Sequence, residues 1–203
     1  MQGIAKLERG YGHIGLLEVP ERKIEAWEIR VAVKAAGLCS SDLHIRNDDI
    51  KLNLRPPIII GHEWAGVIIE VGASSPLKVG QRVIAQTTVK TCGTCYLCMS
   101  GHENICERRE IFGYFHHGAF APRTIVAADR AFVLPDEISF EEGVLFEPLA
   151  CVVHGMIETG NIARGSSVAI AGPGTIGLLA LQVAKALDCT TIITGPKSSS
   201  HRL

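Results

Sequence analysis

The chain has 203 residues, 47% of them hydrophobic, which is enough to bury a core and to form one domain with part of a second. Its formal net charge of -1 excludes the strongly basic surface expected of a protein that binds nucleic acid or an acidic membrane. No stretch approaches ~20 consecutive apolar residues, and the N-terminus lacks the basic and apolar regions of a signal peptide. We therefore expect a cytoplasmic protein whose partners are small molecules, with no nucleic-acid or membrane partner.

The first 150 residues have the pattern of short strands separated by Gly, Pro, Asn and Asp. Apolar residues alternate with others over residues 29–33, before a turn at Gly37, and residues 65–71 have the composition of a second strand. This pattern predicts a mostly β first domain over residues 1–150.

The pattern changes after Pro148. An apolar helical stretch runs to about Met156 and is followed by a strand at residues 167–171, a helix at 178–187 and a strand at 191–194. A strand, a helix and a second strand in this order open a parallel, doubly wound α/β sheet. Residues 151–203 are therefore predicted to form the N-terminal part of a dinucleotide-binding domain.

Four of the seven cysteines are spaced C-x-x-C-x-x-C-x7-C, namely Cys92, Cys95, Cys98 and Cys106. Such short steps let two thiolates bind one ion from a tight turn, and Gly93 and Gly101 permit the turns. Four sulfur ligands leave no position for water, so the pattern predicts a structural zinc site. An iron–sulfur cluster and unligated thiols remain as alternatives.

A second possible ligand set consists of Cys39, His62 and Glu63. The cysteine follows one expected strand and the other two residues precede another, so their side chains could converge at adjacent strand ends. Three ligands would leave a fourth position open, as a catalytic zinc ion requires. Taken alone, the same residues are also compatible with a buried cysteine and a histidine hydrogen-bonded in a turn.

Three motifs together, residues 39–44 (CSSDLH), residues 61–63 (GHE) and the four-cysteine loop, resemble the zinc-containing medium-chain dehydrogenases. Residues 135–155 and 171–187 extend the resemblance, which is greatest to the sorbitol, threonine and related polyol dehydrogenases and covers essentially the whole chain. It implies a GroES-like β-barrel followed by a Rossmann domain. It also implies two zinc ions per chain, one catalytic and one structural.

The resemblance assigns roles to individual residues. Cys39, His62 and Glu63 match the catalytic zinc ligands. Ser41 and His44 match a hydroxyl and an imidazole that relay a proton toward solvent. Asp42 would accept a hydrogen bond from a ligand imidazole and fix its tautomer, or would be an exposed turn residue.

Glu147 precedes Pro148, which is expected at the first position of a helix. The matching glutamate of the polyol dehydrogenases contacts the metal or its water, so the resemblance makes Glu147 an exchangeable ligand or an acid–base residue. Charge pairing with the helix N-terminus is the alternative. Cys151 and Cys189 are expected to be small, buried residues.

Gly172, Gly174 and Gly177 form a G-x-G-x-x-G motif between an expected strand and helix. There the helix N-terminus can bind the pyrophosphate of a dinucleotide. At the end of the next strand, NAD-preferring members of the family carry an acidic residue, whereas this chain has Gly195. The residues that follow are basic or polar: Lys197, Ser198 and Arg202. The expected cofactor is therefore NAD or NADP, with a slight preference for NADP.

The resemblance implies an oxidoreductase that transfers hydride from a secondary alcohol or polyol to NAD(P), with a homodimer or homotetramer as the parent enzyme. The family's Rossmann domain contains several further strands, so we expect this chain to bind NAD(P)H weakly and to turn over little alcohol. The alternative function is that of a non-catalytic, zinc-binding fragment of such an enzyme.

Overall fold

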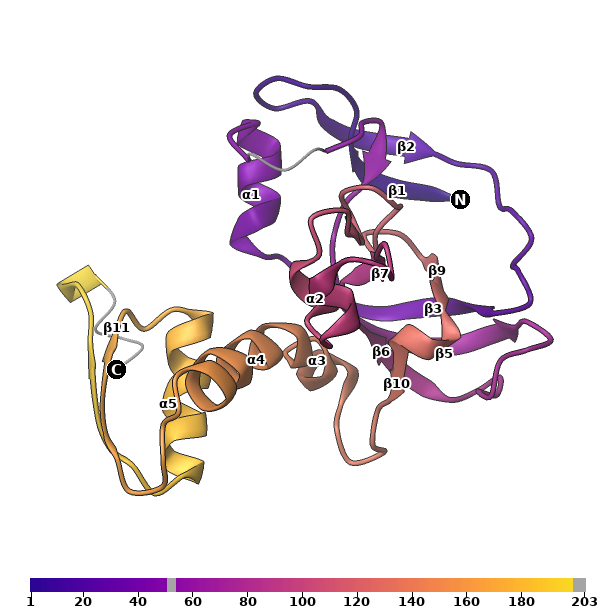
Figure 1. Ribbon diagram of the computed structural model, residues 1–203. Coiled ribbons are helices and arrows are strands. Elements are labelled where there is room, and N and C mark those ends of the chain that lie inside the picture. Colours follow the sequence, from indigo (N-terminus) through magenta and orange to yellow (C-terminus); the bar gives the residue numbers. More distant parts are fainter. Residues whose placement is uncertain (51–53, 199–203) are drawn as a thin grey trace. The chain divides into compact units, whose positions relative to one another are not determined.

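The computed structural model describes residues 1–50 and 54–198. The chain forms two compact units, Met1–Leu145 and Phe146–Leu203 (Figure 1). No helix in the described ranges is long and apolar enough to cross a membrane. The expectation for Arg202 falls outside these residues.

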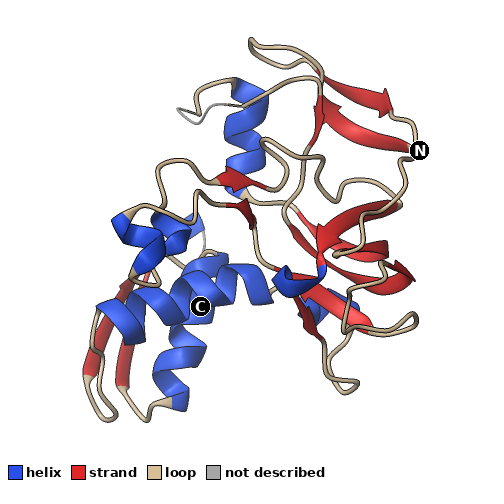
Figure 2. Cartoon of the chain, turned by 45° about the vertical axis from the view of Figure 1, so that its right-hand side comes forward, coloured by secondary structure: helices blue, strands red, loops and turns tan. Residues whose placement is uncertain are grey.

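The first unit is mostly β, as predicted, and its strands form three antiparallel sheets (Figure 2). The largest sheet has the order β10-β6-β5-β3-β9, with bounds Ala131–Val133, Arg82–Ala85, Glu63–Val71, Glu28–Gly37 and Arg123–Ala127. A second sheet has the order β2-β1-β4, with bounds Ile14–Glu18, Gln2–Lys6 and Ile58–Ile59. The third pairs β7, Thr88–Lys90, with β8, Glu110–Ile111. Within the described residues these sheets do not close into one hydrogen-bonded barrel.

Short helices connect the strands of this unit. Their bounds are Ser40–Asn47 for α1, Tyr96–Met99 for α2, Glu103–Ile105 for η1, Ala128–Arg130 for η2 and Phe140–Gly143 for α3. Of these, α1 begins just after β3, whereas α2 and η1 lie in the loop that carries the four closely spaced cysteines.

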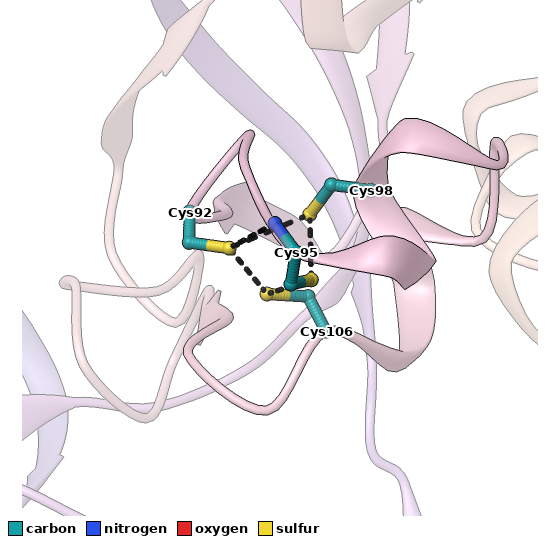
Figure 3. A group of neighbouring side chains, drawn as sticks. All are labelled: Cys92, Cys95, Cys98 and Cys106. Atoms are coloured by element: carbon teal, nitrogen blue, oxygen red, sulfur yellow. Dashed lines mark hydrogen bonds between the residues drawn. The ribbon is translucent and has the colours of Figure 1, made fainter.

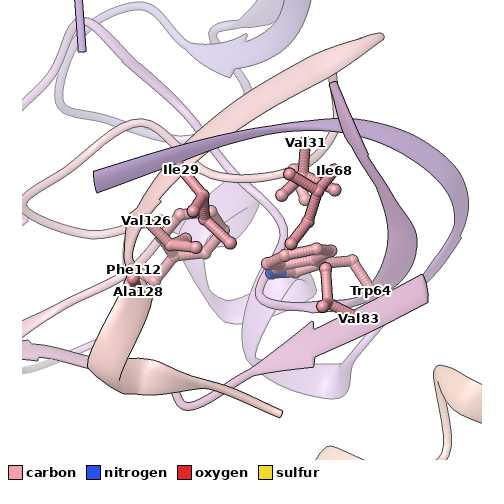
Figure 4. Close-up of a cluster of buried hydrophobic side chains, with 9 residues drawn as sticks. Ile29, Val31, Trp64, Ile68, Val83, Phe112, Val126 and Ala128 are labelled. Atoms are coloured by element: carbon pink, nitrogen blue, oxygen red, sulfur yellow. The ribbon is translucent and has the colours of Figure 1, made fainter. Parts of the chain in front are cut away.

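The hydrophobic core of the first unit lies against the five-stranded sheet (Figure 4). Ile29 and Val31 on β3 are fully buried, as the alternating pattern predicts, and they pack with Trp64 of β5. Burial of each such side chain contributes about 1.5–3 kcal/mol. The strand expected at residues 65–71 begins two residues earlier, because its ladder with β3 continues to Glu63. The other members of the cluster are Ile68, Val83, Phe112, Ala119, Val126 and Ala128.

The second unit contains the predicted β-α-β arrangement. Helix α4, Phe146–Val153, continues as the π-helical segment η3, His154–Thr159, and precedes β11, Ser167–Ala171. Helix α5, Thr175–Ala186, then leads to β12, Thr190–Thr194, which pairs in parallel with β11. The helix begins three residues before the expected Leu178, because Gly174 is its N-cap.

Three local expectations for the second unit are wrong. Pro148 is the third residue of α4 instead of the first, because the helix already begins at Phe146. Cys151 is exposed and Cys189 is only partly buried, although both were expected in a core. Within the described residues, the sheet of this unit has only two strands, which leaves little surface to cover these side chains.

Candidate metal centres

The four closely spaced cysteines converge in the loop between β7 and β8 (Figure 3). Their Sγ–Sγ distances are 3.8 Å for Cys92–Cys98, 3.5 Å for Cys95–Cys98, 3.9 Å for Cys95–Cys106 and 3.6 Å for Cys106–Cys92. A tetrahedral zinc ion with Zn–S bonds of about 2.3 Å requires Sγ–Sγ distances of about 3.8 Å. The four thiols therefore have the geometry of a closed tetrahedral site. All four are free cysteines, with sulfurs too far apart for disulfides.

The electrostatics of the cluster also suit a cation. Backbone N–H groups of Thr94 and Cys95 donate to Cys92 Sγ and lower the pKa of this thiol to about 5. Burial, together with the Cys95 thiol, raises the pKa of Cys98 to about 11. The Cys92 thiol therefore loses its proton more easily than an ordinary thiol, whereas the Cys98 thiol loses its proton less easily. A bound cation would allow all four to ionise.

An ion pair joins the cysteine loop to the sheet. Arg130 of η2 donates to both carboxylate oxygens of Glu103 in η1, with 3.2 Å between Nη2 and Oε2, and its Nη1 also donates to Gln86. The hydrogen bond from Arg130 lowers the pKa of Glu103. The apolar side chains of the loop contribute little core, since Tyr96 is 82% exposed and Met99 76%. These side chains therefore stabilise the loop little, and the Arg130–Glu103 ion pair is one of its contacts with the rest of the unit.

The second ligand set is assembled by the pairing of β3 with β5. Gly37 at the end of β3 is the register partner of Glu63 at the start of β5, and Cys39 follows as the N-cap of α1. A Cβ at Gly37 would lie 2.5 Å from Glu63 Oε2 and 2.7 Å from Val144 Cγ1, so a larger residue there would have to displace these side chains. Potential ligand atoms of Cys39, His62 and Glu63 all lie within 4.8 Å of one another.

Asp42 and Ser41 of α1 lie beside opposite nitrogens of His62. Asp42 is 2% exposed; its Oδ2 accepts a hydrogen bond from the Cys39 backbone, and its Oδ1 lies 3.8 Å from His62 Nδ1. Burial raises the pKa of Asp42, although the neighbouring His62 opposes this. Ser41 Oγ lies 3.4 Å from His62 Nε2. Nε2 of His62 therefore lies on the side of the Ser41 hydroxyl, and Nδ1 on the side of the Asp42 carboxylate.

Two further residues contact predicted site residues, and neither carried a recognisable sequence signal. The Tyr114 ring lies 5.8 Å from the His62 ring and is buried beside it. Asp49 lies just beyond the end of α1, and its Oδ1 is within hydrogen-bond distance of His44 Nδ1, at 2.8 Å. Glu147, the remaining predicted site residue, lies in the first turn of α4, in the second unit.

The glycine-rich turn of the second unit connects β11 to α5. Gly172 has φ +103°, and a Cβ at Gly177 would lie 1.9 Å from Gly172 O. The Gly172 N–H donates to Thr194 O at the end of β12. Gly195 follows, where a Cβ would lie 2.5 Å from Pro173 Cδ, and the side chain of Lys197 is exposed. The turn and the two strand ends thus form the compact backbone of a G-x-G-x-x-G motif.

Comparison with known families places this geometry in context. The profile of the alcohol dehydrogenase GroES-like domain matches residues 25–136, which include both candidate metal centres. The chain belongs to this family. The match confirms the resemblance and the fold class that the sequence motifs predicted, a GroES-like domain followed by the start of a Rossmann domain.

Curated relatives in this family cover the chain from end to end. It is 34% identical to D-arabitol-phosphate dehydrogenase of Enterococcus avium over 100% of the chain and 58% of the relative. It is 36% identical to sorbitol dehydrogenase of Halalkalibacterium halodurans over 100% of the chain and 59% of the relative. The chain therefore spans less than two thirds of the length of these dehydrogenases.

Solved structures of dehydrogenases also match the whole chain and just over half of their own length. The chain is similar to a structure from Sinorhizobium meliloti that is named a zinc-binding dehydrogenase and contains bound NADP. The TM-score is 0.88 and the sequence identity is 28%, and the match covers 99% of this chain and 57% of that one. Galactitol-1-phosphate dehydrogenase from Escherichia coli has a TM-score of 0.86 and 30% identity, over 100% and 57%.

Proposed function

We propose that this chain is the catalytic domain, with the opening of the cofactor domain, of a zinc-dependent dehydrogenase that oxidises a secondary alcohol or polyol with NAD(P). The observation that carries the proposal is the convergence of Cys39, His62 and Glu63 beside the Ser41 hydroxyl. A thiol, an imidazole and a carboxylate suit zinc and leave a fourth position for a substrate oxygen.

Zinc bound there would supply a Lewis acid that lowers the pKa of an alcohol. The residues of the chain have three tasks in this proposal. Asp42 orients His62 so that Nε2 faces the ligand set. Ser41 takes the proton of the substrate hydroxyl, and His44 passes a proton to solvent. Glu147 remains a proposed exchangeable ligand or acid–base residue, and Cys92, Cys95, Cys98 and Cys106 are proposed to hold the structural zinc ion.

The second unit is proposed to bind the dinucleotide. The N-terminus of α5 and the turn formed by Gly172, Gly174 and Gly177 offer backbone N–H groups to a pyrophosphate. Gly195 carries no negative charge at the end of β12, and Lys197 follows it, so a 2′-phosphate would not be repelled. The bound NADP in the Sinorhizobium meliloti structure supports NADP as a cofactor. The names of the relatives favour sugar alcohols, their phosphates or a hydroxy amino acid as substrates.

The proposal is tested first by metal content. We expect close to two zinc ions per chain by elemental analysis, and one in a His62→Ala variant, since only the open site loses a ligand. His154→Ala is the matched control, because this exposed histidine belongs to neither ligand set and should leave both ions bound. Loss of both ions in His62→Ala would contradict two separate sites.

Turnover distinguishes the enzyme from a zinc-binding fragment. Sorbitol, threonine and arabitol phosphate would be assayed with NAD and with NADP, and His62→Ala should abolish any activity found. The fragment alternative is favoured by one fact, that only two strands of the dinucleotide sheet are present in the described residues. Two zinc ions without turnover or dinucleotide binding would support that alternative.

A further inference from the structure

The turn that ends α1 brings a carboxylate onto His44. Asp48 has left-handed backbone angles, φ 56° and ψ 30°, and caps the helix. The Asp49 N–H donates to the backbone oxygen of His44 at 3.2 Å, which folds the chain back over the last turn. As a result the Asp49 Oδ1 lies 2.8 Å from His44 Nδ1.

The N-terminal loop holds this turn in place. Asp48 Oδ2 accepts from the Gly10 N–H at 2.7 Å, and Asp48 Oδ1 lies 3.0 Å from Arg9 Nε. Lys6 is fully buried, and its Nζ donates to backbone oxygens of the same loop and to the Arg46 oxygen in α1 at 3.2 Å. The left-handed conformation at Asp48 is thus held by contacts from outside the helix, and it places the Asp49 backbone against the last turn of α1.

The His44–Asp49 pair lies on the helix that also carries Ser41, whereas the comparable His154–Glu158 pair lies elsewhere. His154 and Glu158 form a comparable exposed pair, at 2.5 Å, within the second unit. His44, however, lies one turn after Ser41 on the same helix, so both side chains share a face. Ser41 in turn contacts His62 at the open ligand set.

We propose that Asp49 is a positioning residue that holds His44 with Nδ1 protonated and Nε2 free to accept a proton. This inference rests on the proposed dehydrogenase function. In the forward reaction the substrate hydroxyl proton passes to Ser41 Oγ, and the proton of Ser41 passes to His44 Nε2. NAD(P)⁺, when bound, would supply the hydride acceptor, and the proton on His44 Nε2 leaves to water. Throughout, Nδ1–H remains hydrogen-bonded to the Asp49 carboxylate, which stabilises the imidazolium.

A purely structural role for this pair predicts something different. His44 and Asp49 are 59% and 54% exposed, and exposed ion pairs contribute little to stability. The thermal midpoint of Asp49→Ala should therefore equal that of the wild type in either case. The tautomer of His44 and the rate separate the two roles.

The experiment uses the zinc-loaded full chain with Asp49→Ala, Asp49→Glu and, as matched control, Glu158→Gln. Nitrogen NMR at a pH where imidazole is neutral should show the Nδ1–H tautomer for His44 in the wild type and a shift to Nε2–H in Asp49→Ala. Glu158→Gln should change His154 alone. An unchanged His44 tautomer in Asp49→Ala would overturn the proposal.

Steady-state kinetics provide the second measurement. Asp49→Ala should lower kcat about 10-fold or more with little change in KM, a part of the usual acid–base contribution, and Asp49→Glu should restore some of it. A changed tautomer with an unchanged kcat would also refute Asp49 as a positioning residue. If the wild type has no turnover, the fragment alternative is supported, and the tautomer still decides whether Asp49 orients His44.

Discussion

Replacing Cys95 with Ser tests the four-cysteine site most directly. Its sulfur lies 3.5 Å from Cys98 and 3.9 Å from Cys106, so it is one of four vertices of the tetrahedron. Structural zinc in small sites contributes about 10–16 kcal/mol, or about 2.5–4 kcal/mol for each of four ligands. A serine hydroxyl remains protonated and cannot replace a thiolate. We expect the variant to bind this zinc ion more weakly, by about 2.5–4 kcal/mol, and to lose a similar amount of stability.

This loss should reach the whole first unit, because the loop is coupled to its core. Phe112 directly follows β8 and is 1% exposed in the main hydrophobic cluster, and Arg130 ties Glu103 to η2. For a chain of this size, about 2.5–4 kcal/mol corresponds to a decrease in Tm of about 5–15 °C.

The assay combines thermal unfolding by circular dichroism with elemental analysis of zinc. Cys189→Ser is the matched control, because this cysteine belongs to neither ligand set, and it should retain both ions and nearly the wild-type Tm. Chelator treatment of the wild type should lower the Tm at least as much as Cys95→Ser does. If Cys95→Ser retains its full zinc content and its Tm, the four-cysteine loop does not bind metal and the geometric argument is wrong.

Ser41→Ala should retain both zinc ions and lower the rate of an active enzyme by about 10²-fold, the usual size of an acid–base step, and an unchanged rate would remove Ser41 from the proton path. Gly177→Ala should weaken dinucleotide binding in a fluorescence titration, since its Cβ would lie 1.9 Å from Gly172 O; unaltered affinity would show that this turn is not the pyrophosphate site. The pKa of Glu103 is lowered by Arg130, so this pair should stabilise the fold above the unfolded-state pKa of about 4.3, with the contribution lost as the pH falls through the lower folded value. Because Glu103 is 39% exposed, the effect should be at most about 1 kcal/mol, and Arg130→Gln should reduce the stability difference between pH 6 and pH 3 in denaturant titrations; an identical pH dependence in both proteins would argue against the pair.

The sequence by itself predicted a mostly β first domain, the β-α-β arrangement that follows it and the residues of both candidate centres. Short ligand spacings such as Cys92 to Cys95 bring sulfurs together within a single turn, so local geometry suffices to predict a site. The alternation at residues 29–33 predicted the buried face of β3, because side chains on a strand point to opposite sides in turn. The G-x-G-x-x-G motif likewise acts over one connection between a strand and a helix.

Contacts between distant segments were decided only by the tertiary structure. The register of β3 against β5, with Gly37 opposite Glu63, brings Cys39 to His62, and no local pattern specifies that pairing. Lys6 and Arg9 likewise hold the turn after α1 from far away in the sequence, and this fixes Asp49 on His44. Exposure was misjudged for Cys151, because burial depends on which other elements cover a side chain, and that is a property of the folded chain alone.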